Sequence, residues 1–253
     1  MNYRAVRQIL ADSDEQVRKR YGSLLPRFEL MAELMDILRK KRSKRGSIDF
    51  DLPEPEIILN LQGQMTDIVR AERNIAHQLI EELMLAANET VAGHLEAMEV
   101  PLLYRVHEEP AEEKLADLVE FLATIGVTIP LSGKVRPRNI QKAIAQVKGT
   151  PEEGLVNTVV LRTMKQARYS EDNIGHFGLA AETYTHFTSP IRRYPDLIVH
   201  RIIKGVIKGK YSSEESREDL AEKLPAEAVH CSQRERTAME AERDVVAMLK
   251  VRF

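Results

Sequence analysis

The longest regular pattern in the chain lies between about Arg73 and Met98, where apolar side chains recur at every fourth residue. The members of this series are Ile75, Leu79, Leu83, Ala87, Val91 and Leu95. An α-helix keeps such side chains near one face, whereas a strand, with its period of two, does not select this spacing. The series therefore predicts one long helix whose apolar face must be covered by other elements.

Most other segments continue the helical pattern, and a few short ones alternate as strands do. One further helix is expected to contain the apolar series Leu30, Leu34, Ile37 and Leu38 and to end at Gly46. Others are expected near residues 6–10, 110–125, 137–148, 151–165, 188–208 and 225–249, and strands near 48–51, 57–59, 65–69 and 102–106. The predicted fold class is α+β, predominantly helical, with small strand clusters and no linker that divides residues 1–253.

The composition excludes several classes of protein. Of 253 residues, 43% are hydrophobic and 30% are charged, as in ordinary globular domains. Cys231 is the only cysteine, so no internal disulfide forms and a reducing, cytoplasmic location is expected. No apolar run approaches the roughly 18 residues of a membrane helix, and the first residues lack the apolar core of a signal peptide. The net charge of -2 argues against a dedicated nucleic-acid-binding domain, which is usually basic.

A run of cations closes the helix that is expected to end at Gly46. It consists of Arg39, Lys40, Lys41, Arg42, Lys44 and Arg45. Cations at a helix C-terminus complement the helix dipole and remain hydrated, so an exposed helix end is the favoured interpretation. A contact with an RNA backbone is the alternative.

The stretch from His186 to Lys210 is the most basic part of the chain, with six Lys or Arg against a single Asp, for a net charge of +5. Ser189-Pro190 is a strong helix start, although Pro195 can make the helix restart there. Arg192 and Arg193 would then lie at a helix N-terminus, where free N–H groups attract anions and arginine forks match phosphate oxygens. Ion pairs with nearby acids are the alternative; the adjacent arginines beside aromatic residues favour phosphate binding.

The segment from His176 to Arg201 resembles the signature of the ribonuclease II/ribonuclease R family of processive 3′→5′ exoribonucleases. Matching residues occur in the same order along the whole chain. They are Asn2-Tyr3 with Val6, Lys44-Arg45-Gly46, Glu81-Glu82 through Asn88, Leu161 through Gln166, and Ala241-Glu242-Arg243-Asp244. The resemblance implies a partial RNB-type catalytic domain that acts, as a monomer, on single-stranded RNA and releases nucleoside 5′-monophosphates.

The resemblance also implies roles for individual residues. Arg192 is similar to the arginine that contacts the scissile phosphate, with Arg193 beside it as an RNA-binding residue, and Glu242 is similar to a glutamate near the reaction centre. Phe50 is similar to an aromatic that clamps the 3′-terminal bases. Tyr3 and Glu81 resemble a pair that recognises the terminal ribose.

Each of these side chains also has a structural interpretation. Phe50 suits a strand residue packed into a core, and Tyr3 an ordinary helix-start aromatic. Glu242 suits a surface ion pair with its helical neighbours. Glu81 has apolar neighbours and shares a seven-residue series with Asn74 and Asn88, which favours a paired or functional carboxylate.

The family holds Mg²⁺ on a D-x-D-D aspartate cluster that precedes the matching region, and this sequence contains no such cluster. The cold-shock-type and S1-type modules of the family have no counterpart here either. The chain is therefore expected to be the C-terminal portion of a catalytic domain, to bind no metal of its own and to be inactive by itself.

Two other functions remain open. The chain could be a non-catalytic RNA-binding or protein-interaction module on the same scaffold. A metal site made of His176, His186, Asp196 and His200 is disfavoured, because the spacing fits no helical metal motif and the neighbours are basic.

Overall fold

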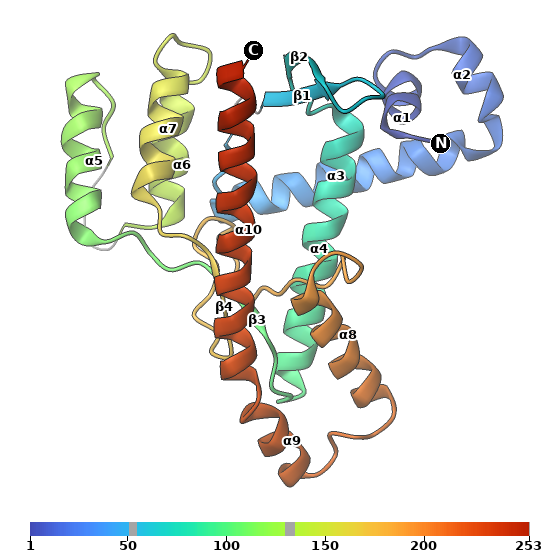
Figure 1. The fold of residues 1–253 in the computed structure, drawn as a ribbon, viewed down its shortest axis with the longest axis vertical. Helices are drawn as coiled ribbons and strands as arrows, with labels where there is room; N and C mark the ends of the chain where they lie inside the picture. The colour runs from blue at the N-terminus through green and yellow to red at the C-terminus, as the bar shows by residue number, and fades with distance from the viewer. Residues whose placement is uncertain (51–54, 130–134, 253) are drawn as a thin grey trace.

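The structure is a computed structural model that describes residues 1–50, 55–129 and 135–252 (Figure 1). Helices dominate these ranges, and the strands form two antiparallel pairs. In chain order the elements are α1 (Tyr3–Leu10), α2 (Glu15–Arg20), α3 (Leu25–Arg45), β1 (Pro55–Leu59), β2 (Met65–Arg70), α4 (Ile75–Ala97), β3 (Tyr104–Val106), α5 (Glu112–Thr124), α6 (Pro137–Gln146), α7 (Glu153–Thr163), β4 (Arg168–Ser170), α8 (Tyr194–Ile207), α9 (Glu214–Ala221) and α10 (Leu224–Arg252). Within these ranges, none of the helices has both the length and the hydropathy to cross a membrane. The predicted α+β, predominantly helical fold class is confirmed.

The two strand pairs are small. β1 pairs with β2 so that Ile57 lies opposite Ile68, and β3 pairs with β4 so that Tyr104 lies opposite Ser170. Sequence periodicity predicted three of these strands, but not β4, a three-residue strand that follows closely on the segment expected to be helical to residue 165. The strand expected near 48–51 does not form over 48–50, and residue 51 lies outside the described residues.

The long helix predicted near residues 73–98 is confirmed as α4, and the side chain of Asn74 caps it by accepting from the Ala76 N–H at 3.0 Å. Its buried face differs from the predicted one. The buried residues are Ala76, Leu79, Glu82, Leu85, Asn88, Ala92 and Leu95. A strict four-residue series drifts by about 40° per step around a helix of 3.6 residues per turn, so only some of its members reach the core.

α3 ends at Gly46 as predicted, with Gly46 in the left-handed region at φ 104°. Its apolar series does not enter a core, however: Leu30, Leu34 and Ile37 are 64%, 44% and 55% exposed. α3 packs on α4 through another face, which carries the buried Arg42. The helix was predicted correctly, but the face that it buries was not.

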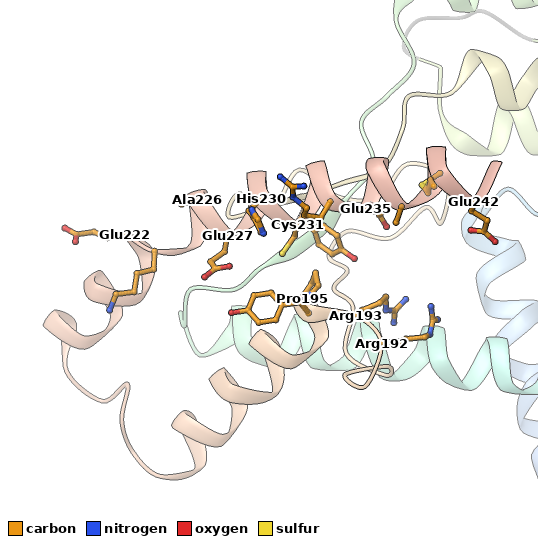
Figure 2. Close-up of a pocket in the computed structure, with 16 residues that line it drawn as sticks. Arg192, Arg193, Pro195, Glu222, Ala226, Glu227, His230, Cys231, Glu235 and Glu242 are labelled. Atoms are coloured by element: carbon orange, nitrogen blue, oxygen red, sulfur yellow. The ribbon is translucent and has the colours of Figure 1, made fainter. Parts of the chain in front are cut away.

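Two large apolar clusters and a small third one, around Leu85, Ala181 and Tyr184, form the core of the described residues. One large cluster joins α4, β3 and β4 to α8 and α10, and the other joins α5, α6 and α7. α10 is fastened to β4 by the backbone N–H of Tyr169, which donates to the Ser232 hydroxyl at 2.9 Å. This packing fixes the N-terminal end of α8 opposite α10 (Figure 2).

Candidate functional site

An open groove of about 1220 Å³ lies between the start of α8 and the length of α10 (Figure 2). Its lining includes Tyr169 from β4, Arg192 and Arg193 from the turn before α8, and Glu235 and Glu242 from α10. We call it the Arg192 groove. Because both predicted catalytic residues line it, the fold brings together two positions that are 50 residues apart in sequence.

The turn that carries the two arginines is formed by backbone hydrogen bonds. The N–H groups of Arg192 and Arg193 donate to the Ser189 carbonyl at 3.2 and 3.1 Å. The helix begins at Tyr194, so the start expected at Ser189 is wrong, whereas the alternative restart at Pro195 is confirmed. Pro195 has no N–H and its ring would clash with a carbonyl one turn earlier, so a helix from Ser189 could not continue through it. Arg192 therefore projects from a turn outside the helix.

A buried ion pair braces this turn. Arg193 Nη2 donates to Asp196 Oδ1 at 2.7 Å, and the same oxygen accepts the Ser189 N–H at 2.7 Å. Asp196 is fully buried, and the Arg193 side chain is 17% exposed. Arg193 thus adds positive potential to the groove while one arm of its guanidinium holds the turn in place.

Arg192 and Glu242 differ from the other charges discussed here. Both are exposed, and neither side chain has a hydrogen bond or ion pair within the described residues. They lie at the same end of the groove (Figure 2). Glu235, by contrast, accepts a hydrogen bond from Arg105 Nη1 at 2.5 Å. Arg192 and Glu242 are therefore available to a ligand.

The lining of the groove also includes the aromatic ring of Tyr169. The Tyr169 hydroxyl lies 2.8 Å from Nδ1 of His186, and the Arg105 guanidinium lies 4.7 Å from the centre of the Tyr169 ring. Burial lowers the pKa of His186 to about 2, with a further contribution from Arg193, so its imidazole is neutral. Burial also raises the pKa of Cys231 to about 11, which keeps this groove residue a thiol and a poor nucleophile at neutral pH.

Tyr3 and Glu81 lie outside the Arg192 groove, at the N-terminal end of α4. The Tyr3 ring stacks on His77, with the ring centres 4.4 Å apart. Glu81, one turn further along, binds Arg73 at 2.9 Å, and Arg73 also contacts Asp49 at 3.2 Å. The buried carboxylate of this helix is the adjacent Glu82, which pairs with Arg42 at 2.6 Å.

Phe50 is half-buried and packs against the apolar cluster of α5, α6 and α7. It does not line the Arg192 groove. This position agrees with the structural interpretation of a core aromatic, and the predicted role in clamping RNA bases stays a prediction.

The residues considered for a metal site make separate contacts. His176 and His186 each meet the ring of Tyr184 edge-on, whereas His200 lies 2.9 Å from the Phe187 carbonyl oxygen. In the described ranges, no three His, Cys, Asp or Glu side chains group so as to hold a metal ion.

Sequence reasoning assigned no role to Asn88, which is fully buried beneath the arginine turn. Its Nδ2 donates to the Tyr184 hydroxyl at 2.9 Å, and its Oδ1 accepts the Phe187 N–H at 3.0 Å. Asn88 thereby ties α4 to the segment leading to Arg192. Its place in the series with Asn74 and Glu81 was the signal that could have identified it.

The decisive similarity is to a domain family, because the profile of the RNB domain matches residues 1–209. The chain belongs to the RNB family. It is 46% identical to ribonuclease R 1 of Lactococcus lactis, with all of this chain and 31% of that protein aligned. It is 37% identical to ribonuclease R of Escherichia coli, again over its full length and 32% of the relative. This RNB chain thus spans about a third of the length of these relatives.

Solved structures of the RNB family show the same fold. Mycoplasma genitalium RNase R in complex with ribose-methylated single-stranded RNA matches with a TM-score of 0.88 and 30% identity, over 98% of this chain and 39% of that one. Yeast Ssd1, described as a pseudonuclease, matches with a TM-score of 0.54 and 26% identity, over 63% of this chain and 20% of that one.

Proposed function

We propose that this chain is the phosphate-binding part of an RNB catalytic domain. The parent enzyme would be a processive 3′→5′ exoribonuclease that hydrolyses single-stranded RNA to nucleoside 5′-monophosphates. The observation that carries the proposal is the exposed guanidinium of Arg192, which has no partner among the described residues and projects from a braced turn into a groove. The single, buried cysteine supports the further proposal of a cytoplasmic location. We also propose that the protein acts as a monomer.

In this proposal Arg192 binds the scissile phosphate. A guanidinium held at a fixed place donates two parallel hydrogen bonds to phosphate oxygens and stabilises negative charge that grows during hydrolysis. Arg193, through its positive charge, draws the RNA backbone toward the same turn. Glu242 serves as a hydrogen-bond acceptor beside the reacting phosphate. Tyr3, Glu81 and Phe50 are proposed to contact the 3′-terminal nucleotides from the end of α4.

Hydrolysis by this family implies Mg²⁺, but the described residues do not fit such a site. Glu81, of the predicted ribose site, and Asp49 are both bound by Arg73, a cation that would repel the metal. We therefore assign no step of the reaction to a metal held by this chain, and propose that the chain by itself binds RNA without cleaving it.

The second candidate is an RNA-binding or protein-interaction module without catalysis. The similarity to yeast Ssd1, a pseudonuclease, favours it, since that protein keeps a related fold. The two candidates differ in whether the parent protein hydrolyses RNA, and both require the Arg192 groove to bind a phosphate if RNA is the ligand.

The first prediction tests the groove. Replacement of Arg192 by Gln is expected to weaken binding of oligo(A) by about 1.5–3 kcal/mol, or roughly 10- to 150-fold, because charge-assisted hydrogen bonds are lost. Fluorescence anisotropy with labelled oligo(A) measures the dissociation constant. Arg201→Gln is the matched control, since Arg201 is an exposed cation of α8 that does not line the groove. Equal losses in both variants would contradict the proposed function.

A further inference from the structure

The six cations at the end of α3 do not form one uniform surface. Arg42 and Arg45 point toward α4 and pair with Glu82 and Glu89, each at 2.6 Å, while Arg39 binds Gln78. Lys40 and Lys44 lie one turn apart on the opposite face, and both are exposed. Within the described residues, neither lysine has a hydrogen bond or ion pair.

α6 brings further cations to the same place. Its first turn abuts the end of α3, where Gln141 Nε2 donates to the carbonyls of Ser43 and Ser47 at 3.0 and 2.9 Å. An added Cβ on Gly46 would lie 2.7 Å from the Cβ of Arg138, so the two backbones are in close contact. Figure 1 shows the C-terminal end of α3 near the N-terminal end of α6.

The cations that α6 contributes are Arg136, Arg138 and Lys142, all of them exposed. We call these three together with Lys40 and Lys44 the α3–α6 patch. The described part of the chain offers no ion pair to any of the five. The α4 acids that face the inner side of α3 are already bound to arginines, and the acids exposed on the same side of α3 as Lys40 are Glu33 and Asp36.

Helix dipoles do not explain this cluster. Lys44 lies in the last turn of α3, where a cation is favoured, but Arg136 and Arg138 flank the start of α6, where a cation is disfavoured. The first turn of α6 contains no acidic residue at all. Five like charges without protein partners therefore repel one another, and a polyanion would relieve the repulsion.

We propose that the α3–α6 patch is a second nucleic-acid contact, which binds the phosphodiester backbone of single-stranded RNA away from the Arg192 groove. The identity of the polyanion as RNA rests on the proposed function. None of the five patch residues lines the groove, so the two surfaces bind different phosphates of one strand. The patch contains no aromatic residue on which a base could stack, so we expect it to bind the RNA backbone by charge, independently of the base sequence.

The experiment uses the whole 253-residue chain and two labelled probes, oligo(A) of about 20 and of about four nucleotides. The patch variant carries Lys40→Gln, Lys44→Gln, Arg138→Gln and Lys142→Gln. The control variant carries Lys19→Gln, Lys114→Gln, Lys208→Gln and Lys250→Gln. The control residues are exposed lysines of α2, α5, α10 and the end of α8, so the two variants lose the same charge.

The patch variant is expected to bind the long probe about tenfold or more weakly than the control variant. Its plot of log K against log salt should be less steep by about 3, since each lost phosphate contact on a single strand removes about 0.7 from the slope. Binding of the short probe should be the same in both variants. Circular dichroism and urea unfolding check that both variants fold, and the Lys40→Gln, Lys44→Gln double variant repeats the test with α6 intact.

Four outcomes overturn the inference. The first is an equal loss of long-probe binding in the patch and control variants, and the second is an equal effect of the patch substitutions on both probes. The third is a preferential loss of binding to a poly(Glu) peptide, which would make the patch a docking site for acidic proteins. The fourth is that the unaltered chain does not bind the long probe. The variant Arg192→Gln separates this inference from the proposed function. If long-probe binding depends on the patch but not on Arg192, the further inference is supported and the proposed role of the Arg192 groove is rejected. If binding depends on Arg192 but not on the patch, only the further inference is rejected.

Discussion

Individual charged residues in this chain divide into those that hold the fold and those that face solvent. Arg42 and Glu82 belong to the first group, because their side chains are 8% and 5% exposed and are joined by several hydrogen bonds. Arg45 and Glu89 form a pair of similar geometry one turn further along, but with 33% and 24% exposure. Burial thus separates two pairs that look alike in the sequence.

Removal of the buried carboxylate should be costly. Glu82→Gln is expected to lower the free energy of unfolding by about 3–5 kcal/mol, because it leaves the buried Arg42 cation with only the longer, 3.8 Å contact to Asp49. Glu89→Gln, the matched control, should change it by less than about 1 kcal/mol. Urea unfolding measures both, and similar values for the two variants would contradict the role given to Glu82.

The sequence located the charged residues of the site better than their surroundings. The resemblance to the RNB family placed Arg192 and Glu242 near each other, and they share a groove. Periodicity alone could not decide whether Glu81 or Glu82 is the buried carboxylate. Adjacent residues on a helix point in directions about 100° apart, and the face of α4 that is buried depends on where α3 packs. For the same reason the sequence could not predict that Lys40 and Lys44 would lie on a face of α3 without ion-pair partners.

At the scale of elements, the junction of α3 with α6 depends on Gly46. Gly46→Ala is expected to lower the free energy of unfolding by at least about 1 kcal/mol more than Gly149→Ala. Both glycines have positive φ, at 104° and 80°, but only at Gly46 does an added Cβ meet the backbone of another helix, whereas nothing lies within 4 Å at Gly149. Equilibrium unfolding in urea compares the two variants. Equal destabilisation would mean that α6 shifts freely away from α3.

The link between β4 and the segment before α8 should make stability depend on pH. The pKa of His186 falls from 6.5 to about 2 on folding, mainly through burial, and that of His176 falls to about 3. The unfolded chain therefore binds more protons below pH 6.5, so this stability is present at neutral pH and is lost as the pH falls. We expect the free energy of unfolding to drop by up to about 1.4 kcal/mol per pH unit for each histidine between pH 6.5 and 5.

Two variants check this pH dependence. His186→Gln should flatten the slope by about half, whereas replacement of the exposed His94 by Gln should leave it steep. Urea midpoints measured at several pH values provide the slope. A slope that is the same in all three proteins would assign the effect to other groups.

Short elements were the hardest to predict. β4 has three residues, and α2 and α9 have six and eight, so each shows little of a period. β3 is as short as β4 but was located because it lies in a longer segment, 102–106, that is mostly apolar. The long helices α4 and α10 were located to within a few residues because their patterns repeat many times. The sequence left the start of α8 open, because two prolines, Pro190 and Pro195, offered competing first turns, and the helix begins at the second of them.

For the whole molecule, the net charge of -2 conceals separate surfaces. The α3–α6 patch is basic, whereas the lining of the Arg192 groove has four Arg or Lys residues against four Glu residues, so the average says little about affinity for RNA. We expect the 253-residue chain to bind oligo(A) more weakly as salt rises but to release no mononucleotide from it in Mg²⁺, because its described carboxylates form no metal site. Electrophoresis of a 5′-labelled oligonucleotide measures this. Mononucleotide release that disappears in Arg192→Gln would show instead that the chain is a complete nuclease.

The C-terminal half of α10 carries part of one wall of the Arg192 groove but has few packing contacts of its own. Between residues 236 and 251 every side chain is exposed except the half-buried Val246 and Leu249, whereas the anchoring contacts of the helix lie near Cys231 and Ser232. Helical segments of this length are marginal in water without packing, so this part of α10 opens more readily than the anchored part. Glu242 lies on that segment. The fraction of molecules in which Glu242 faces Arg192 is therefore set by the helix–coil equilibrium of this part of α10. Amide hydrogen exchange along α10 would report how often the groove has both of its charges.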